Sequence, residues 1–480
     1  MLDADACYRA LRARDARFDG RFFVAVRSTR IYCRPICTVR TPKRESCAFF
    51  SSAAAAEAAG YRPCLRCRPE LAPGNASVDA VGRLARAVAS AIEDGALDER
   101  SLADLAAALG TSGRHVRRAF VAQFGVSPIA YAQTQRLLLA KRLLTDTTLS
   151  VTEVAFASGF GSLRRFNALF KKRYRLNPMK LRTRAQRLAP DLPFDAMPFQ
   201  LAFRPPYDWQ SLVGFLGTRA IDGVEEASAD VYRRAVRIER SGKTHSGWIA
   251  VSPVRGKPAL RVLMSSSLVG AVAPVIARVK HAMDLGADPH EIGAVLGSLA
   301  KGCPGLRVPG AFDGFEVAVR AVLGQHISVK AARTIAGRFA VAFGSPVDSP
   351  FSGVSRLFPR ASDIAKLGVD DIASLGIVAS RARTILALAR AIAHGDFELV
   401  PGGDVNAALH ALRAVPGIGE WTAQYIAMRA MAWPDAFPHG DLGLKKALGE
   451  TSPNRVLKAG EAWRPWRAYA AMHLWRSLAS

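Results

Sequence analysis

Four of the seven cysteines in this 480-residue chain lie in two close pairs near its start. Cys33 and Cys37 form a C-x3-C pair, Cys64 and Cys67 form a C-x2-C pair, and a proline lies in or beside each pair. Each pair can offer two sulfur atoms to one cation from a tight turn, and four thiolates suit tetrahedral zinc. Because the paired spacing disfavours four buried free thiols, the sequence predicts one Zn2+ bound by these cysteines. The remaining cysteines lack partner spacing and are expected to be small core residues: Cys7, Cys47 and Cys303.

A second candidate for chemistry is the carboxylate of Asp441, in the segment DAFPHGDLGLKKAL. It lies at the predicted start of a helix. A carboxylate there either serves only as an N-cap or also faces a substrate. Upstream, the turn V-P-G-I-G within residues 412–428 joins two predicted helices, so that backbone N–H groups point outward together and can bind a phosphate. With the Trp-Thr-Ala that follows, this is a helix-hairpin-helix signature. The candidate phosphate contacts are Gly417, Gly419 and Lys445.

Residues 102–128 and 151–178 repeat one pattern of a short helical segment, a glycine-containing turn and a second helical segment. This layout predicts two helix-turn-helix units on one linking helix, whose recognition helices would enter successive major grooves. Residues 111–187 hold 16 Lys and Arg but only two acidic residues, which favours a DNA footprint. The candidate recognition residues open the second helix of each unit: Ser112, Arg114, His115, Arg118, Ser162, Arg164, Arg165 and Asn167.

The formal net charge of +26 is concentrated in the first 190 residues, which carry 33 Lys and Arg against 15 Asp and Glu. Such an excess favours double-stranded DNA as a partner, although a charged surface can also serve only solubility. The start of the chain lacks the apolar region of a signal peptide, and the longest uncharged run, 262–277, is too short to span a membrane. We therefore expect a cytoplasmic, nucleoid-associated bacterial protein with no membrane partner. Nothing resembles a dimerisation helix, so a monomer is expected.

Length and composition predict several domains, because 480 residues that are 50% hydrophobic can bury cores in units of roughly 100–200 residues. A proline-rich stretch near residue 190 breaks the helical pattern, and strand-like alternation then gives way to helical periodicity. The predicted fold is multidomain and mainly α with α+β parts: a small zinc-bound α/β domain (1–75), an all-α double helix-turn-helix (76–187), a linker (188–197), a small antiparallel-sheet α+β domain (198–310) and an all-α helix-hairpin-helix domain (311–480).

The segments FFVAVRSTRIYCRPICTVRTPKRESCAFF and AAGYRPCLRCRPE resemble the N-terminal domain of the Ada family of bacterial alkylation sensors, across residues 1–75. The resemblance implies that Cys33 is a zinc ligand that also takes a methyl group, irreversibly, from a methylated DNA phosphate. Losing one negative charge there weakens the repulsion of DNA, which makes the lesion an electrostatic switch. The alternative is a purely structural zinc knot. Residues 111–187 lie in a region that resembles AraC-type regulators, which implies transcription activation with RNA polymerase as a partner.

Residues 203–475 resemble AlkA, the 3-methyladenine DNA glycosylase II family of the helix-hairpin-helix superfamily. Asp441 matches the essential aspartate of that family, which stabilises positive charge on the sugar while an alkylated base leaves. A tryptophan stands where strand-cutting relatives place a lysine, which implies a monofunctional enzyme, and the resemblance implies no cofactor for this half. Histidine replaces the leucine that AlkA inserts into the duplex, which leaves the substrate range open. The implied base-pocket residues are Trp421, Tyr425 and Trp466, and the implied wedge residues are Gln325 and His326.

The sequence therefore predicts a fusion of an alkylation-sensing transcription activator with a DNA-3-methyladenine glycosylase. One alternative is a damage-responsive regulator whose second half binds lesions without turnover, which the intact context of Asp441 disfavours. Another is an enzyme whose first half only tethers it to DNA. The Pro-Cys-His-Arg motif of the Ada methyltransferase domain is absent from the sequence, so we expect no repair of O6-methylguanine.

Overall fold

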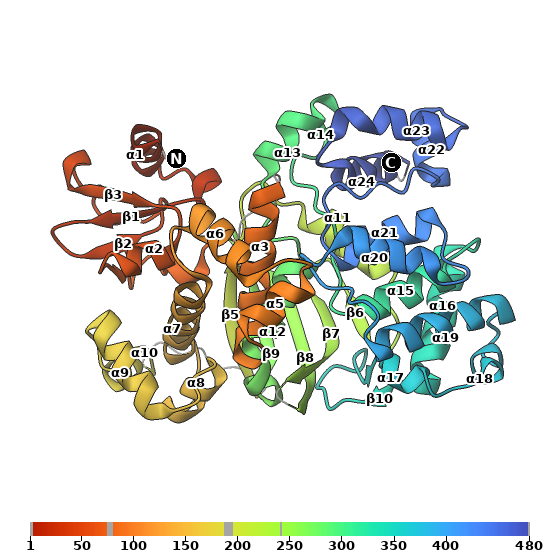
Figure 1. Cartoon of the computed structure of the whole chain (residues 1–480), viewed down its shortest axis with the longest axis horizontal. Helices are drawn as coiled ribbons and strands as arrows, with labels where there is room; N and C mark the ends of the chain where they lie inside the picture. Colours follow the sequence, from red (N-terminus) through yellow and green to blue (C-terminus); the bar gives the residue numbers. More distant parts are fainter. Residues whose placement is uncertain (1–2, 74–79, 187–194, 241, 479–480) are drawn as a thin grey trace.

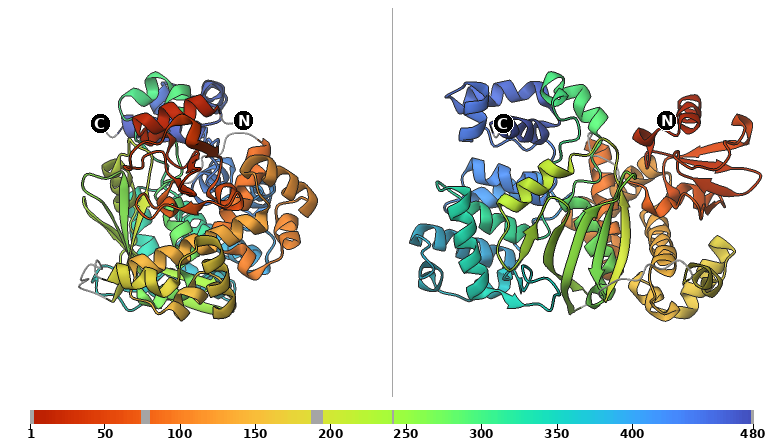
Figure 2. Two further views of the ribbon diagram at one scale, coloured as in Figure 1. Left: turned by 90° about the vertical axis from the view of Figure 1, so that its left-hand side faces the viewer. Right: turned by 180° about the vertical axis from the view of Figure 1, so that it is seen from behind.

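The computed structural model describes residues 3–73, 80–186, 195–240 and 242–478. The cysteine-rich segment (red) and the second helix-turn-helix unit (yellow) lie at one end of the long axis, and the C-terminal helices (blue) lie at the other (Figure 1). A green β-sheet stands between them, and the rear view in Figure 2 shows its face clearly. This arrangement confirms the predicted multidomain, mainly helical fold with small sheets. Within the described ranges, no helix is long and apolar enough to cross a membrane.

The N-terminal domain is a four-stranded sheet of order β3-β1-β2-β4 with a helix on each side. Alternate side chains of the first strand point to opposite faces, as the pleat requires. Val24 therefore packs with Leu11 in one small core, whereas Phe23 and Ala25 pack with Tyr32 in another. The elements are α1 (Ala4–Ala13), β1 (Phe23–Val26), β2 (Ile31–Cys33), β3 (Cys47–Phe50), α2 (Ala53–Ala58) and β4 (Arg62–Pro63).

The next region contains the two predicted helix-turn-helix units, and their local structure repeats. Ser101 with Asp104 and Ser150 with Glu153 form matching capping boxes at the first helix of each unit. A serine again caps each second helix, and a proline opens the helix that follows. The helices are α3 (Ala80–Glu93), α4 (Ala96–Glu99), α5 (Leu102–Ala108), α6 (Gly113–Phe124), α7 (Pro128–Asp146), α8 (Val151–Ala157), α9 (Leu163–Tyr174) and α10 (Pro178–Gln186).

The sheet of the second half is fully antiparallel, with order β5-β9-β8-β7-β6. Its first strand begins at Ala196 and so includes the last residues of the predicted linker, most of which lies outside the described residues. One core joins this sheet to the second helix-turn-helix unit, because residues of α7, α8 and α9 pack together with residues of the sheet and α12. The elements are β5 (Ala196–Ala202), α11 (Trp209–Thr218), β6 (Glu225–Ala227), β7 (Tyr232–Arg240), β8 (Lys243–Pro253), β9 (Ala259–Ser265) and α12 (Val272–Ala282).

The rest of the chain is helical apart from one two-stranded ribbon, and it contains two cores. Residues 287–308 share a core with residues 428–474, so this packing unit crosses the domain boundary predicted at residue 310. The other core lies among the helices from α15 to α21. The elements are α13 (Pro289–Leu296), α14 (Ser298–Lys301), α15 (Gly314–Leu323), α16 (Val329–Phe343), β10 (Ser345–Pro346), β11 (Arg356–Leu357), α17 (Ala361–Ile364), α18 (Val369–Ala373), α19 (Ala379–His394), α20 (Val405–Ala414), α21 (Glu420–Ala430), α22 (Leu442–Leu448), α23 (Pro453–Gly460) and α24 (Arg467–Ser477).

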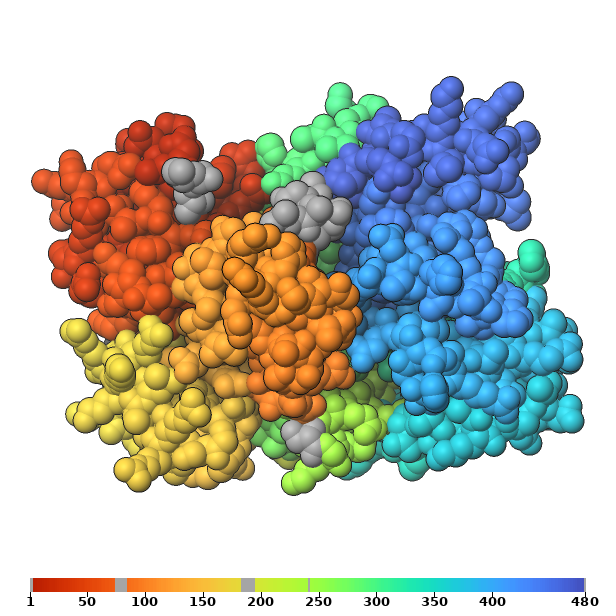
Figure 3. Space-filling view, in the orientation of Figure 1, coloured from red at the N-terminus to blue at the C-terminus, as the bar shows by residue number. Residues whose placement is uncertain are grey.

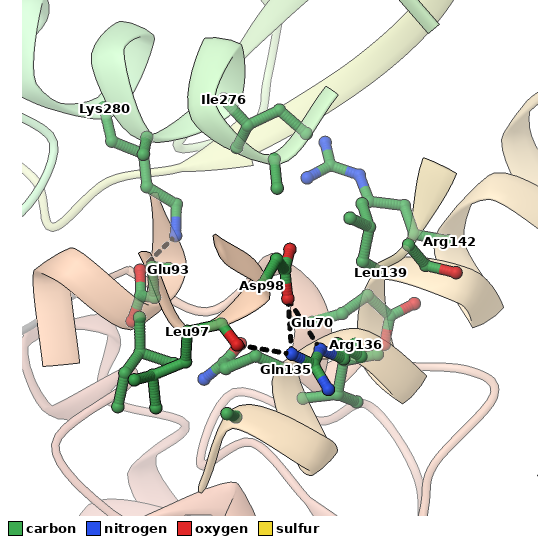
Figure 4. Close-up of a pocket in the computed structure, with 16 residues that line it drawn as sticks. Glu70, Glu93, Leu97, Asp98, Gln135, Arg136, Leu139, Arg142, Ile276 and Lys280 are labelled. Carbon is green, nitrogen blue, oxygen red and sulfur yellow. Dashed lines mark hydrogen bonds and ion pairs between the residues drawn. The ribbon is translucent and has the colours of Figure 1, made fainter. Parts of the chain in front are cut away.

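The two halves are in contact, and the helices from α3 to α7 (orange) lie against the second half in the space-filling view (Figure 3). Ion pairs line a small pocket between α12 and these helices (Figure 4). Lys280 donates to Glu93 at 3.0 Å, and Asp98 accepts from Arg136 at 2.8 Å. Asp98 also pairs with Arg240 of β7. Ion pairs between charged groups of the two halves therefore stabilise this interface.

Candidate functional sites

The carboxylate of Asp441 receives hydrogen bonds on both oxygens. As the N-cap of α22, it accepts the backbone N–H of Leu444 on Oδ1 at 3.0 Å, which is the capping role that the sequence allowed. Oδ1 also accepts the indole N–H of Trp475 at 2.8 Å, and Oδ2 accepts the indole N–H of Trp421 at 2.8 Å. Three donors from α21, α22 and α24 thus fix the direction of this carboxylate. A carboxylate held in this way can face a developing positive charge without reorganising.

Aromatic rings stand beside Asp441. Trp421 and Tyr425, one turn apart on α21, are stacked with ring centroids 5.3 Å apart and an interplanar angle of 8°. Trp475 lies 6.4 Å from Tyr425 with its ring tilted by 56°. Burial raises the pKa of Tyr425, but the guanidinium groups of Arg429 and Arg219 outweigh burial and hold this pKa below its ordinary value. The electron-rich ring faces can receive a cationic base.

Trp466, which the sequence analysis placed in the base pocket, lies elsewhere. Its side chain is 2% exposed, packs edge-on against Tyr469 at 5.7 Å and belongs to the core around α24. Trp475, not Trp466, is the C-terminal tryptophan that donates to the carboxylate of Asp441. Sequence reasoning missed Trp475 because the run WRPWRAYAAMHLW offers several aromatic residues, and only packing decides which one faces Asp441.

The hairpin between α20 and α21 requires glycine at position 417. Gly417 has φ +90°, and a Cβ there would lie 2.1 Å from Oγ1 of Thr384. That hydroxyl donates to the carbonyl of Pro416 at 2.8 Å, which ties the hairpin to α19. Gly419 is the N-cap of α21 and leaves the first N–H groups of this helix without a side-chain cap. Lys445 lies one turn beyond Asp441 on α22.

The two predicted wedge residues have different surroundings on the turn between α15 and α16. Nε2 of Gln325 donates to the carbonyl of Gly417 at 3.0 Å and to Oγ1 of Thr422 at 3.1 Å. Arg381 donates to the backbone carbonyl of Gln325. His326 is exposed and has φ +56°, a backbone conformation uncommon outside glycine. Gln325 therefore fixes the turn to the hairpin, and His326 forms its exposed tip.

The four predicted zinc ligands are brought together. One sulfur from each of Cys33, Cys37, Cys64 and Cys67 lies within 4.8 Å of the others. The backbone N–H of Arg34 donates to Sγ of Cys67 at 3.3 Å, in addition to the contacts among the thiols. Cys67 is the most accessible of the four and Cys33 is 6% exposed, so exposure does not single out Cys33 as the methyl acceptor.

The donor set fits a divalent cation. Hydrogen bonds from neighbouring thiols, first of all Cys33, lower the pKa of Cys37 to about 7 and lower that of Cys64 as well. Hydrogen bonds with the other thiols, first of all Cys37, raise the pKa of Cys33. The hydrogen bond with Cys33 lowers the pKa of Cys67, but those with Cys37 and Cys64, together with burial, outweigh it and raise this pKa. Only added positive charge lets all four sulfur atoms ionise together, and Zn2+ suits four thiolates.

The predicted recognition residues lie where the repeat placed them. Ser112 and Ser162 are N-caps and accept the N–H groups of His115 and Arg165 at 3.2 Å and 3.4 Å, so both serines also serve the helix. The other predicted residues are exposed on the first two turns of α6 and α9: Arg114, His115, Arg118, Arg164, Arg165 and Asn167.

Comparison with known proteins identifies the domains in chain order. The matching families are described as "Metal binding domain of Ada" over residues 6–70, "Helix-turn-helix domain" over 105–184, "AlkA N-terminal domain" over 198–313 and "HhH-GPD superfamily base excision DNA repair protein" over 319–455. A Mycobacterium tuberculosis protein named probable bifunctional transcriptional activator/DNA repair enzyme AlkA is 38% identical over 99% of this chain and 97% of its own length. The chain belongs to this bifunctional family.

Each half of this bifunctional protein also has its own relatives. Escherichia coli DNA-3-methyladenine glycosylase 2 is 32% identical over 58% of the chain and 96% of its own length. The Escherichia coli bifunctional transcriptional activator/DNA repair enzyme Ada is 36% identical over 33% of the chain and 43% of its own length. The structure of a 3-methyladenine DNA-glycosylase from Archaeoglobus fulgidus shares the fold, with a TM-score of 0.50 and 20% identity over 58% of this chain and 97% of that chain. The predicted fusion of a zinc-binding, DNA-binding activator with a DNA glycosylase is thus confirmed.

Proposed function

We propose that the C-terminal half releases 3-methyladenine and related alkylated bases from duplex DNA, with Asp441 as its catalytic carboxylate. The observation that carries this proposal is the pair of indole donors on the two oxygens of Asp441, at 2.8 Å each, beside the stacked rings of Trp421 and Tyr425. A carboxylate that served only as an N-cap would not need both indoles. The arrangement suits a reaction in which a cationic base leaves and positive charge appears on the sugar.

The chemistry follows from that charge. Alkylation at a ring nitrogen makes the base cationic, so it departs as a neutral molecule with the electron pair of its bond to C1′. Positive charge then develops on the sugar, where the fixed carboxylate of Asp441 stabilises it. Water adds to C1′ and gives up a proton to the carboxylate or to solvent, which leaves an abasic sugar. Because a tryptophan occupies position 421, no lysine amine is placed there to attack C1′ and cut the strand.

Access to C1′ requires the nucleotide to leave the base stack. We assign the rings of Trp421, Tyr425 and Trp475 to the extruded base and the exposed tip His326 to the space that it vacates. The N–H groups at Gly417 and Gly419 and the ammonium of Lys445 would hold the phosphates. Gln325 would only fix the backbone of the turn that carries His326, because its own side chain is hydrogen-bonded to the hairpin.

Release of bases from methylated duplex DNA by wild type and by Asp441→Asn tests this proposal. We expect the variant to lose roughly 100- to 1,000-fold in rate, because it removes the charge that stabilises the transition state. Glu450→Gln is the matched control, since Glu450 lies just beyond the same helix and its carboxylate pairs with Arg455 at 3.7 Å. Abasic product that breaks only after alkali treatment would support monofunctional action. Absence of base release by wild type would instead favour a regulator that binds lesions without turnover.

In the N-terminal half, we propose that Cys33 accepts a methyl group from a DNA methyl phosphotriester. Its thiolate forms an S–C bond as the C–O bond breaks, and the electron pair leaves on oxygen as the phosphodiester anion, so no proton moves. Bound zinc would supply the positive charge that keeps the four sulfur atoms ionised. Methylation removes one negative charge near the DNA, and α6 and α9 then hold the operator more tightly. RNA polymerase is the proposed partner in activation.

Peptide mass mapping after exposure to methylated DNA tests this second proposal. We expect one added methyl group on the peptide that contains Cys33 and none on the peptide that contains Cys67, although Cys67 is more accessible. Operator affinity measured before and after methylation should rise, and Cys33→Ser should abolish the rise. Unchanged affinity and unchanged transcription would mean that the first half only tethers the glycosylase to DNA.

A further inference from the structure

Gly443 lies beside the hydrogen bond between the carboxylate of Asp441 and the indole of Trp475, and it has no side chain there. A Cβ built on Gly443 would lie 2.9 Å from Oδ1 of Asp441, 3.1 Å from Cδ1 of Trp475 and 3.4 Å from Nε1 of Trp475. Gly443 does not have a positive φ, so backbone conformation does not require glycine there. Glycine inside a helix destabilises it relative to alanine. The contacts therefore supply the reason for glycine at the second residue of α22.

Neither neighbour of Gly443 can move away without losing a hydrogen bond. Asp441 is anchored by the N–H of Leu444 on Oδ1 and by Trp421 on Oδ2, and Trp421 is itself stacked on Tyr425. Trp475 belongs to α24, whose preceding residues are buried in the C-terminal core. A new methyl group would therefore break the hydrogen bond between Trp475 and Oδ1 of Asp441.

We propose that Gly443 is a positioning residue of the glycosylase: its missing side chain lets the indole N–H of Trp475 reach Asp441 and so fixes the carboxylate toward the sugar. This inference rests on the proposed catalytic role of Asp441. Gly443 itself touches no substrate and acts only through the hydrogen bond between Trp475 and Asp441. An added methyl group should thus lower the rate of the chemical step without weakening the binding of DNA.

The chain offers a matched control on the other side of Asp441. Beyond its chain neighbours His439 and Asp441, a Cβ on Gly440 would meet no atom of the described residues within 4 Å, and Gly440 also lacks a positive φ. Gly440→Ala therefore adds the same methyl group one residue from the carboxylate but leaves the contact with Trp475 intact. The comparison of Gly443→Ala with Gly440→Ala separates a steric effect on this contact from a general effect of replacing glycine.

The experiment measures single-turnover base release and duplex affinity for wild type, Gly443→Ala, Gly440→Ala, Trp475→Phe and the double variant Gly443→Ala/Trp475→Phe. We expect Gly443→Ala to lose roughly 10- to 100-fold in rate, as for loss of a hydrogen bond to a charged group, with unchanged affinity. Gly440→Ala should match wild type. Trp475→Phe removes the N–H and part of the ring, so adding Gly443→Ala to it should cause no further loss.

Two results would overturn the inference: a wild-type rate for Gly443→Ala, or losses that multiply in the double variant. The double variant also tests poor folding of Gly443→Ala, because the smaller phenyl ring relieves the contacts of the methyl group with position 475. Asp441→Asn in the same series separates the two proposals. If Asp441→Asn keeps its rate, the proposed function fails; if it loses its rate while Gly443→Ala does not, only the role of Gly443 fails.

Discussion

Tyr174, the last residue of α9, donates a hydrogen bond from its hydroxyl to Oε1 of Glu57 in α2, over 3.2 Å. The hydroxyl of Tyr32 donates to the same oxygen at 3.0 Å, and Thr134 of α7 donates to the other at 3.3 Å. Glu57 is 2% exposed, so one buried carboxyl joins the cysteine-rich domain to the linking helix and to the second recognition helix. Tyr32 precedes Cys33, which places this junction next to the proposed methyl acceptor.

The stability of this junction should depend on pH. Burial raises the pKa of Glu57 to about 7, against the opposing effect of its hydroxyl donors, so the folded state holds this proton more tightly than the unfolded chain does. The resulting stability is present below the unfolded pKa of about 4.5 and is lost as pH rises through about 7. By pH 8 the loss should reach about 3 kcal/mol, and Glu57→Gln should remove it. Urea unfolding followed by circular dichroism at pH 5.5, 7 and 8 measures the difference between the two proteins.

Tryptophan fluorescence provides a second probe: all seven tryptophans lie at or beyond Trp209, and Trp209 shares a core with Tyr174, a donor to Glu57. The fluorescence transition should therefore depend less on pH in Glu57→Gln than in wild type. An equal free-energy difference between the two proteins at pH 5.5 and pH 8 would show that Glu57 does not titrate in this range.

Removal of zinc should affect only the first half. The cysteine cluster has its own small core, whereas Asp441 and its donors lie among helices of the second half. A chelator should abolish methyl transfer and lower the melting temperature of the N-terminal domain, because the four sulfur atoms lose the charge that holds them together. Base release from methylated DNA should keep its rate within about twofold. A parallel loss of base release would indicate that the two activities are coupled.

Replacing Trp421 with phenylalanine should separate the two roles of this side chain. The variant keeps an aromatic ring on Tyr425 but removes the N–H that Oδ2 of Asp441 accepts. We expect the single-turnover rate to fall roughly 10- to 100-fold with little change in DNA affinity. Trp466→Phe is the control, since Trp466 lies in the core, and its rate should match wild type. A reduced rate for Trp466→Phe would instead support the predicted role of Trp466 in the base pocket.

The parts of the protein that the sequence predicted correctly are those that local chemistry decides. The spacing of Cys33 to Cys67 indicated one cluster, and the repeated caps of the helix-turn-helix units follow from serine and acidic residues at fixed offsets. Trp466 and Trp475 differ only in which packed surface they face, and periodicity does not contain that information. The core that joins residues 287–308 to the C-terminal helices was missed for the same reason, because it arises from contacts distant in sequence.

The interface between the halves should depend on Asp98 more than on any exposed pair. Asp98 lies between Arg136 and Arg240, and the side chains of Asp98 and Arg240 are 15% and 10% exposed. Asp98→Ala leaves both guanidinium groups without this partner, which costs roughly 3 kcal/mol for a largely buried pair. Glu398→Ala is the matched control, because Glu398 and Arg100 form an exposed pair across the same interface at 3.4 Å, worth about 0–1 kcal/mol. Small-angle X-ray scattering should give a larger radius of gyration for Asp98→Ala and an unchanged one for Glu398→Ala. If both variants keep the wild-type radius, the apolar core that joins the second helix-turn-helix unit to the sheet holds the halves together by itself.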